Sequence, residues 1–156
     1  MNIFFYEYPI GTIGIAESND AICRVFFGKE KMPHSYEIKE TPLIKNAAAQ
    51  LKEYLDGKRI KFELPFHYNG TDFQRLAWEA LMKIPAGETR SYKDIAESIG
   101  RPKACRAVGM ANHRNPLAIF IPCHRVVETG GGLGGYAGGL FIKKYLLDLE
   151  KRSCSV

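Results

Sequence analysis

Residues 119–127 read IFIPCHRVV, so a cysteine, a histidine and an arginine directly follow an apolar run that ends in proline. A thiol beside a base and a cation can act as a nucleophile, because the thiolate is the reactive form and nearby positive charge favours it. We therefore expect Cys123 to ionise more readily than a free cysteine, helped by His124 and Arg125. The alternative is a small buried cysteine beside a structural histidine.

Two neighbouring elements must position this pair. The apolar run 119–121, bounded by proline, predicts a buried strand that delivers Cys123 to the point where the chain leaves the core. Residues 129–139, TGGGLGGYAGG, predict a close-approach loop that forms one wall of a pocket, a flexible connector being the alternative. Gly130, Gly132 and Gly135 satisfy the GxGxxG string. We expect no dinucleotide site, because the remaining chain leaves no room for the second strand of a βαβ unit.

The second half also predicts a helix-turn-helix. Thr71 begins a helix that stops before Pro85, Ser91 begins a second helix that Gly100 closes, and Pro102 begins a third. Two short helices joined by a glycine-containing turn are typical of DNA-binding proteins, although many helical hairpins share the pattern.

The third of these helices has few long polar side chains for a helix that would recognise bases in the major groove. Lys103 and Arg106 lie in it and Arg101 lies beside it, but its other residues are mainly Ala, Val, Gly and Met. Such a helix suits contact with the DNA backbone or insertion into the minor groove better than sequence-specific reading. A last helix is predicted from the apolar positions Leu140, Phe141, Tyr145, Leu146 and Leu149, with Glu150 near its end.

The first half predicts a smaller α/β unit. We expect residues 2–9 and 12–17 to form a hairpin around Gly11 and residues 21–28 to form a third strand. Thr41 is expected to cap a helix that ends at Gly57. The predicted fold class is therefore α/β (α+β), with two domains. Residues 1–66 form a three-stranded sheet with a helix, and residues 67–156 form a winged helix-turn-helix-like DNA-binding domain that carries the cysteine.

Charge separates the same two halves. The formal net charge is +5; residues 1–66 carry nine basic and nine acidic side chains, whereas residues 67–156 carry thirteen and eight. Between Arg101 and Arg125 there are five basic residues and no acidic ones. This block favours a polyanionic partner, nucleic acid first, over a merely solvated basic face.

Cysteine spacing and hydropathy indicate the cellular compartment. Cys23, Cys105, Cys123 and Cys154 show no CxxC spacing, which favours a reduced, cytoplasmic protein, or a nuclear one in a eukaryote. No apolar stretch approaches the length of a membrane span and no signal peptide is evident, so we expect no membrane association.

Four segments resemble the O6-alkylguanine-DNA alkyltransferases, also called methylated-DNA–protein-cysteine methyltransferases. They are SYKDIA at 91–96, RAVGMANHRNP at 106–116, IPCHRVV at 121–127 and GYAGGLFIKKYLLDLE at 135–150, in matching mutual spacing. The resemblance implies a DNA repair protein that flips O6-alkylguanine out of duplex DNA and transfers the alkyl group, once and irreversibly, to its own cysteine. It implies no cofactor, a monomer, and approach from the minor groove.

The resemblance also implies a role for particular residues. Cys123 would accept the alkyl group, His124 would activate the thiol through a bound water, Glu150 would orient the imidazole, and Tyr92 would help to protonate the departing guanine. Arg106 would fill the gap left by the flipped nucleotide, and Asn115 would brace the turn before the active-site segment. The implied DNA contacts are Arg101, Lys103, Arg106, Ala107, Arg114 and Arg125; the implied guanine pocket is Val126, Gly135, Tyr136, Ala137 and Gly138.

The chain departs from the family pattern at two places. Ala137 stands where many members have serine, so a side-chain hydroxyl contact to the lesion is lost. Some members bind a structural zinc, but Cys23, His34 and His67 do not make a convincing tetrahedral site, and we expect no metal.

Other function classes remain to be distinguished. An alkyltransferase-like module would bind lesions without transfer, but such proteins replace the cysteine. A Cys–His–Glu hydrolase would have no use for the basic helix-turn-helix, and a plain transcription regulator would not need the PCHR segment.

Overall fold

The computed structural model describes residues 1–154, and the chain divides into two compact units, Met1–Tyr68 and Asn69–Val156. Each unit has its own core. The division falls close to the predicted one after residue 66.

The first unit is built on a four-stranded sheet. Its strands are β1 (Asn2–Tyr8), β2 (Gly11–Ser18), β3 (Ala21–Phe27) and β4 (Glu37–Ile38), in the order β3-β2-β1-β4. The first three are antiparallel, as the pattern predicts, and β4 adds a short parallel pairing with β1 that the sequence did not reveal. Asn19 and Asp20 both have positive φ (52° and 61°), which is the backbone that a tight hairpin between β2 and β3 requires.

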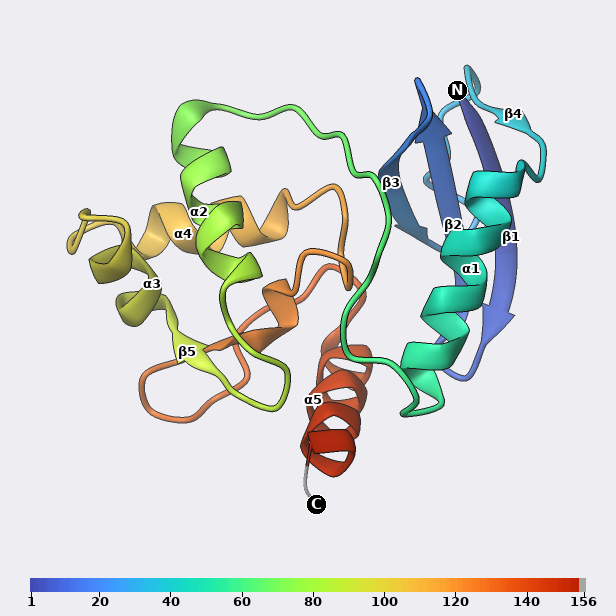
Figure 1. Cartoon of the computed structure of the whole chain (residues 1–156). Coiled ribbons are helices and arrows are strands. Elements are labelled where there is room, and N and C mark those ends of the chain that lie inside the picture. Colours follow the sequence, from blue (N-terminus) through green and yellow to red (C-terminus); the bar gives the residue numbers. More distant parts are fainter. Residues whose placement is uncertain (155–156) are drawn as a thin grey trace. The chain divides into compact units, whose positions relative to one another are not determined.

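Helix α1 (Pro42–Leu55) covers one face of this sheet (Figure 1). Thr41 caps it by accepting a hydrogen bond from the amide of Ile44, and Pro42 occupies its first turn, where a missing N–H costs nothing. The apolar stripe of α1 packs on β1, β2 and β3, and the core consists largely of aliphatic side chains. Its fully buried members include Ile3, Ile13, Ile15, Ile22, Ile44 and Leu51.

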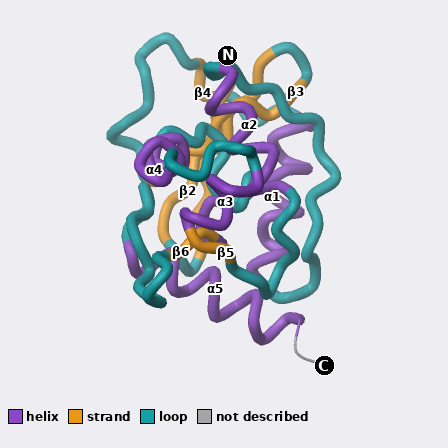
Figure 2. The backbone as a smooth tube through the Cα atoms, turned by 90° about the vertical axis from the view of Figure 1, so that its left-hand side faces the viewer, coloured by secondary structure: helices purple, strands orange, loops and turns teal. Residues whose placement is uncertain are grey.

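Between residues 69 and 154, the second unit contains four α-helices and a minimal two-stranded sheet. The helices are α2 (Asp72–Met82), α3 (Tyr92–Ser98), α4 (Cys105–His113) and α5 (Leu140–Cys154). Strand β5 (Arg90–Ser91) pairs in parallel with β6 (Val126–Val127), and Figure 2 shows the two strands side by side. Helices α2 and α3 begin after Thr71 and Ser91 as predicted, and both residues form capping boxes.

Helices α3 and α4 form the predicted helix-turn-helix, with a corrected start for α4. Gly100, at φ 75°, closes α3. The amide of Ala104 bonds to the carbonyl of Arg101 (2.9 Å), so Pro102 lies inside a turn rather than at the first position of α4, which starts at Cys105. Trp78 of α2 is buried, and its indole N–H donates to the carbonyl of Ala111 in α4 (2.9 Å), which joins α2 to this motif.

The prediction of a strand before Cys123 is wrong. Ile119 has φ 76°, and the amide of Ile121 bonds to the carbonyl of Leu117 (2.8 Å), so this segment is a buried tight turn. It leads into a 3-10 helix, Cys123–Arg125. Three consecutive apolar residues indicate burial but do not distinguish a buried strand from a buried turn.

The buried face of α5 also differs from the predicted one. Leu146 and Leu149 are buried as expected, but Phe141 is 71% exposed. Two ionisable residues, Lys143 and Glu150, lie on the buried face instead. Both serve the site described below.

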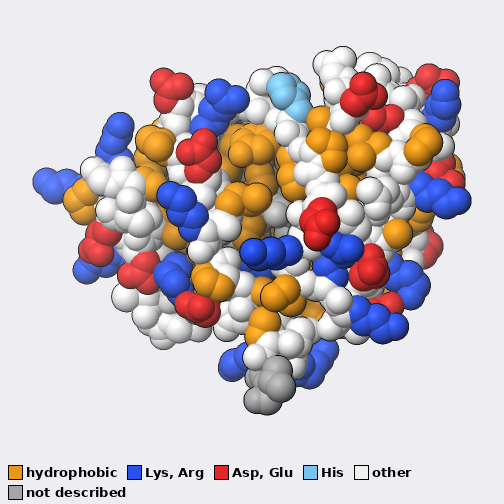
Figure 3. All heavy atoms as spheres, viewed as in Figure 1, with side chains coloured by type: hydrophobic (Ala, Val, Ile, Leu, Met, Phe, Trp, Pro, Cys, Tyr) orange, Lys and Arg blue, Asp and Glu red, His pale blue; other side chains and the backbone are white. Residues whose placement is uncertain are grey.

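Surface charge follows an ordinary pattern on the face drawn in Figure 3, where basic and acidic side chains are interspersed. Within residues 1–154, none of the helices is both long enough and apolar enough to span a membrane.

Candidate active site

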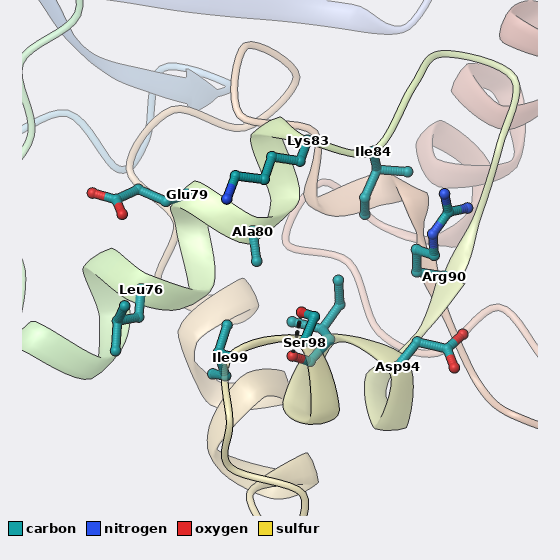
Figure 4. Close-up of a pocket in the computed structure, with 10 residues that line it drawn as sticks. Leu76, Glu79, Ala80, Lys83, Ile84, Arg90, Asp94, Ser98 and Ile99 are labelled. Atoms are coloured by element: carbon teal, nitrogen blue, oxygen red, sulfur yellow. Dashed lines mark hydrogen bonds between the residues drawn. The ribbon is translucent and has the colours of Figure 1, made fainter.

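A hollow of about 770 Å3 lies between α2 and α3, and its lining holds neither a cysteine nor a histidine (Figure 4). Aliphatic side chains and a charged rim form it. The lining residues are Leu76, Glu79, Ala80, Lys83, Ile84, Arg90, Asp94, Ile95, Ser98 and Ile99. The chemistry therefore belongs elsewhere.

A smaller cavity of about 180 Å3 contains Cys123. Sequence reasoning anticipated Tyr92, Cys123, Gly135, Tyr136 and Ala137 in its lining and missed three residues of α4, which are Gly109, Asn112 and His113. Val126 and Gly138 were expected there and are not among the lining residues. The small-residue character of α4 was the available signal, since it lets this helix approach Tyr92.

Tyr92 reaches the cavity because β5 pairs with β6. Ser91 lies opposite Val127 in this ladder and caps α3, so Tyr92, the first residue of the helix, stands beside the segment that follows Cys123. The loop packs closely on the ring, since a Cβ placed on Gly134 would lie 2.5 Å from the Tyr92 hydroxyl oxygen. Burial raises the pKa of Tyr92, so the phenol remains a proton donor.

Asn115 holds the turn that precedes Cys123. Its Nδ2 donates to the carbonyl of Ile121 (2.9 Å), and its Oδ1 accepts from the amide of Leu117 (2.9 Å). The same side chain interacts with the thiol of Cys123. This one amide therefore supports a turn in which β-branched Ile119 adopts a left-handed conformation that such residues rarely take.

The environment of Cys123 overturns the expectation of a readily ionised thiol. The residue is 6% exposed, and burial raises the pKa of its thiol to about 11, although Asn115 and the charge of Lys143 act in the opposite direction. A buried thiolate loses its hydration, and this cost outweighs the neighbouring charges. The resting nucleophile is therefore the protonated thiol, and it needs a base.

His124 is a buried neutral imidazole oriented by Glu150. Its Nε2 lies 2.7 Å from Glu150 Oε2. Burial lowers the pKa of His124, against the opposing effect of the carboxylate. Because an ionised carboxylate only accepts hydrogen bonds, Nε2 carries the proton, and Nδ1 keeps a lone pair that no protein group within residues 1–154 engages. That lone pair can accept a proton.

Arg125 completes this cluster and is buried, contrary to the expectation that it contacts DNA. Its Nε and Nη2 each donate to Glu150 (2.8 Å), and its Nη1 donates to the carbonyl of Ile84 (2.7 Å). Burial alone would raise the pKa of Glu150, but hydrogen bonds from His124 and Arg125 hold it well below its ordinary value. The guanidinium serves to ionise the carboxylate that orients the base.

Lys143 is a site residue that sequence reasoning missed. It is fully buried, and its ammonium donates to the carbonyls of Val126 (2.6 Å) and Gly135 (3.2 Å). From the sequence, a lysine on an amphipathic helix is expected to face solvent. Only the packing of the folded protein shows that Lys143 is buried.

With the exception of Arg125, the residues expected to contact DNA are exposed. Helix α4 buries Val108 and Ala111 and turns its other side to solvent. The exposed candidates are Arg101, Lys103, Arg106, Ala107 and Arg114. This is a surface on which phosphates can be neutralised.

The residues considered as zinc ligands, Cys23, His34 and His67, are not part of a cluster of potential metal ligands among the residues that the structure describes. Cys23 lies in β3, where its thiol donates weakly to the carbonyl of Ala16 (3.6 Å). Within residues 1–154, no three His, Cys, Asp or Glu side chains gather as metal ligands would.

Both units match known families. Residues 3–68 match the 6-O-methylguanine DNA methyltransferase ribonuclease-like domain, and residues 72–152 match the DNA-binding domain of the same name. The constitutive methylated-DNA–protein-cysteine methyltransferase of Bacillus subtilis is 48% identical over 154 residues, covering 94% of this chain and 93% of that protein. The Methanosarcina barkeri protein of the same name is 48% identical over 151 residues, covering 94% and 95%.

Solved structures agree. The Mycobacterium tuberculosis OGT in complex with DNA superimposes with a TM-score of 0.92 at 38% identity, covering 98% of this chain and 94% of that one. The M. tuberculosis O6-methylguanine methyltransferase gives a TM-score of 0.90 at the same identity, covering 99% and 95%. The chain belongs to the 6-O-methylguanine DNA methyltransferase family.

Proposed function

We propose that this protein repairs O6-alkylguanine in duplex DNA by transferring the alkyl group to Sγ of its own Cys123. The observation that carries the proposal is a buried thiol that lines a small cavity and is followed in the chain by a histidine. Nδ1 of this histidine is left available to accept a proton, because a buried carboxylate binds its Nε2. This is the nucleophile, base and orienter arrangement that covalent catalysis uses.

The proton on the thiol moves before or with the attack. The high pKa of Cys123 means that almost no thiolate exists at neutral pH. His124 Nδ1 accepts the proton through a bound water, and Glu150 and Arg125 stabilise the imidazolium that forms. A thiol kept protonated until a substrate arrives is protected from stray electrophiles, because the thiolate is the reactive form.

The sulfur then displaces guanine from the alkyl carbon. The Sγ–C bond forms as the C–O6 bond breaks, and the purine leaves with an electron pair that protonation stabilises. Tyr92 lines the same cavity and keeps its proton, so it donates to the departing base. The proton taken by His124 balances the one supplied by Tyr92, and the products are an S-alkylcysteine and guanine.

The target carbon cannot be reached inside the base stack. The nucleotide must therefore be extruded into the cavity, which α4 and the glycine-rich loop enclose. Exposed Arg106 enters from the minor groove and occupies the gap, while Arg101, Lys103 and Arg114 neutralise phosphates. The thioether is not cleaved again, so each molecule acts once, as a monomer.

Intact-protein mass spectrometry tests the proposal directly. The protein is mixed with a duplex oligonucleotide that carries one O6-methylguanine, and the product is mapped by peptide. We expect one added methyl group on Cys123, saturating at one equivalent, retained in Cys105→Ala and lost in Cys123→Ala. Tight, lesion-selective binding without added mass would instead indicate a lesion-binding module.

A further inference from the structure

Lys143 carries a charge into the interior without an acidic partner. Its side chain is 0% exposed, and within the described part of the chain it forms no ion pair with a carboxylate. Burying an ammonium costs several kcal/mol unless nearby groups compensate it. Two neutral carbonyls, those of Val126 and Gly135, are its hydrogen-bond partners, so the positive charge remains available to a third group.

The positions of these partners show where that charge acts. Gly135 lines the cavity, and Val126 follows Cys123 by three residues. The ammonium also lies 6.0 Å from the centre of the Tyr92 ring. The side chain of Lys143 in α5 therefore links the glycine-rich loop to the active-site segment. Its charge lies near the nucleophile, Cys123, and the proton donor, Tyr92.

The other cations near the thiol are already engaged. Arg125 forms a bidentate pair with Glu150, and His124 is held neutral by burial. The titratable and charged groups around the cavity, the thiol and the ammonium come from α3, α4, the 3-10 helix, β6 with the residue after it, and α5. They are Tyr92, His113, His124, Arg125, Glu128 and Glu150.

We propose that Lys143 is a positioning residue of the alkyl-transfer reaction, whose buried ammonium fixes the Gly135 wall of the cavity and stabilises negative charge as it develops on the sulfur of Cys123. This inference rests on the proposed function. Its physical basis is that a cation held in a low-dielectric interior favours the anionic form of a neighbouring acid. Burial lowers the pKa of Lys143 and raises that of Cys123, and each charge opposes the shift of the other, as this coupling requires.

The test compares Lys143→Met with Lys143→Arg in single-turnover transfer from an O6-methylguanine duplex, measured as a function of pH. Lys143→Met moves the pH midpoint of the rate upward and slows transfer at neutral pH by about tenfold or more, since one pKa unit is a tenfold change in thiolate. Lys143→Arg keeps the charge and restores the midpoint, even if its rate is lower. A folded Lys143→Met protein with an unmoved midpoint overturns the proposal.

Lys144→Met is the matched control, because Lys144 is the next residue of α5, is 68% exposed and pairs with Asp148 at the surface (3.2 Å). We expect wild-type rates and an unchanged midpoint for it.

A second measurement covers the case in which Lys143→Met does not fold. The ammonium of Lys143 is titrated by NMR in the wild type and in Cys123→Ala. Burial lowers the pKa of Lys143 and the charge of Cys123 opposes that effect, so coupling predicts a still lower lysine pKa once the thiol is removed; an identical pKa in both proteins refutes the inference. This titration needs no alkyl transfer, so its failure is separate from failure of the proposed function.

Discussion

Replacing Arg125 by methionine should destabilise the second unit strongly. The substitution keeps an unbranched apolar stem and removes three hydrogen bonds, two to Glu150 and one to the carbonyl of Ile84. Glu150 is buried, and it would lose both of its hydrogen bonds from Arg125 while keeping the one with His124. Removing one member of a buried ion pair costs about 3–5 kcal/mol, because an uncompensated charge stays behind.

The loss is measurable by urea unfolding. With a slope of about 2 kcal/mol per molar urea, the midpoint should fall by roughly 2 M, and the melting temperature by about 10 °C. The single tryptophan, Trp78, is buried in the same unit and provides a fluorescence signal specific to it. Arg114→Met is the control, since this exposed arginine should change the stability by less than about 0.5 kcal/mol.

The effect also has a predicted pH dependence. The pKa of Glu150 is depressed in the folded protein, so the stability it contributes is complete above its unfolded pKa and is lost as pH falls toward the folded value. Arg125→Met removes much of that depression, and the gap between the two proteins should therefore narrow in acid. Equal, small losses in Arg125→Met and Arg114→Met, or a gap that stays constant from neutral to acidic pH, would refute the reasoning.

Three further outcomes are expected. Gly134→Ala should displace Tyr92 and slow single-turnover transfer at least tenfold, because its Cβ would lie 2.5 Å from the phenol oxygen. Gly131 also has positive φ, but a Cβ there meets nothing within 4 Å, so Gly131→Ala should not slow transfer. Equal transfer rates in the two variants would show that Tyr92 takes no part in the chemistry. Asn115→Ala leaves one buried backbone donor and one buried acceptor without their partner, so it should lower the free energy of unfolding in urea by about 1–3 kcal/mol. An unchanged unfolding midpoint would contradict this prediction. Lys103→Ala should weaken DNA binding across sequences and reduce the slope of log affinity against log salt by about one, measured by fluorescence anisotropy; an unchanged slope would place Lys103 away from the phosphates.

Elements specified by local chemistry were predictable from the sequence. Thr41, Thr71 and Ser91 each begin a helix, because a side-chain oxygen there accepts an amide that has no intrahelical partner. The alternating strands of the first unit and the glycine that closes α3 follow from equally local rules. The two-residue strands β4, β5 and β6 could not be predicted from local rules, because they form only by pairing with a distant segment and have no pattern of their own.

The sequence by itself determined the reactive residue types, their spacing and the family to which they point. The tertiary structure alone decided what each charge does. Arg125 belongs to the basic block in the sequence, yet it is directed inward, where Glu150 compensates it. Lys143 belongs to an amphipathic helix, yet two backbone carbonyls hold it in the core. The physical reason is that burial and pairing depend on segments far apart in the chain, and these set the pKa of Cys123 opposite to what its neighbours in sequence suggest.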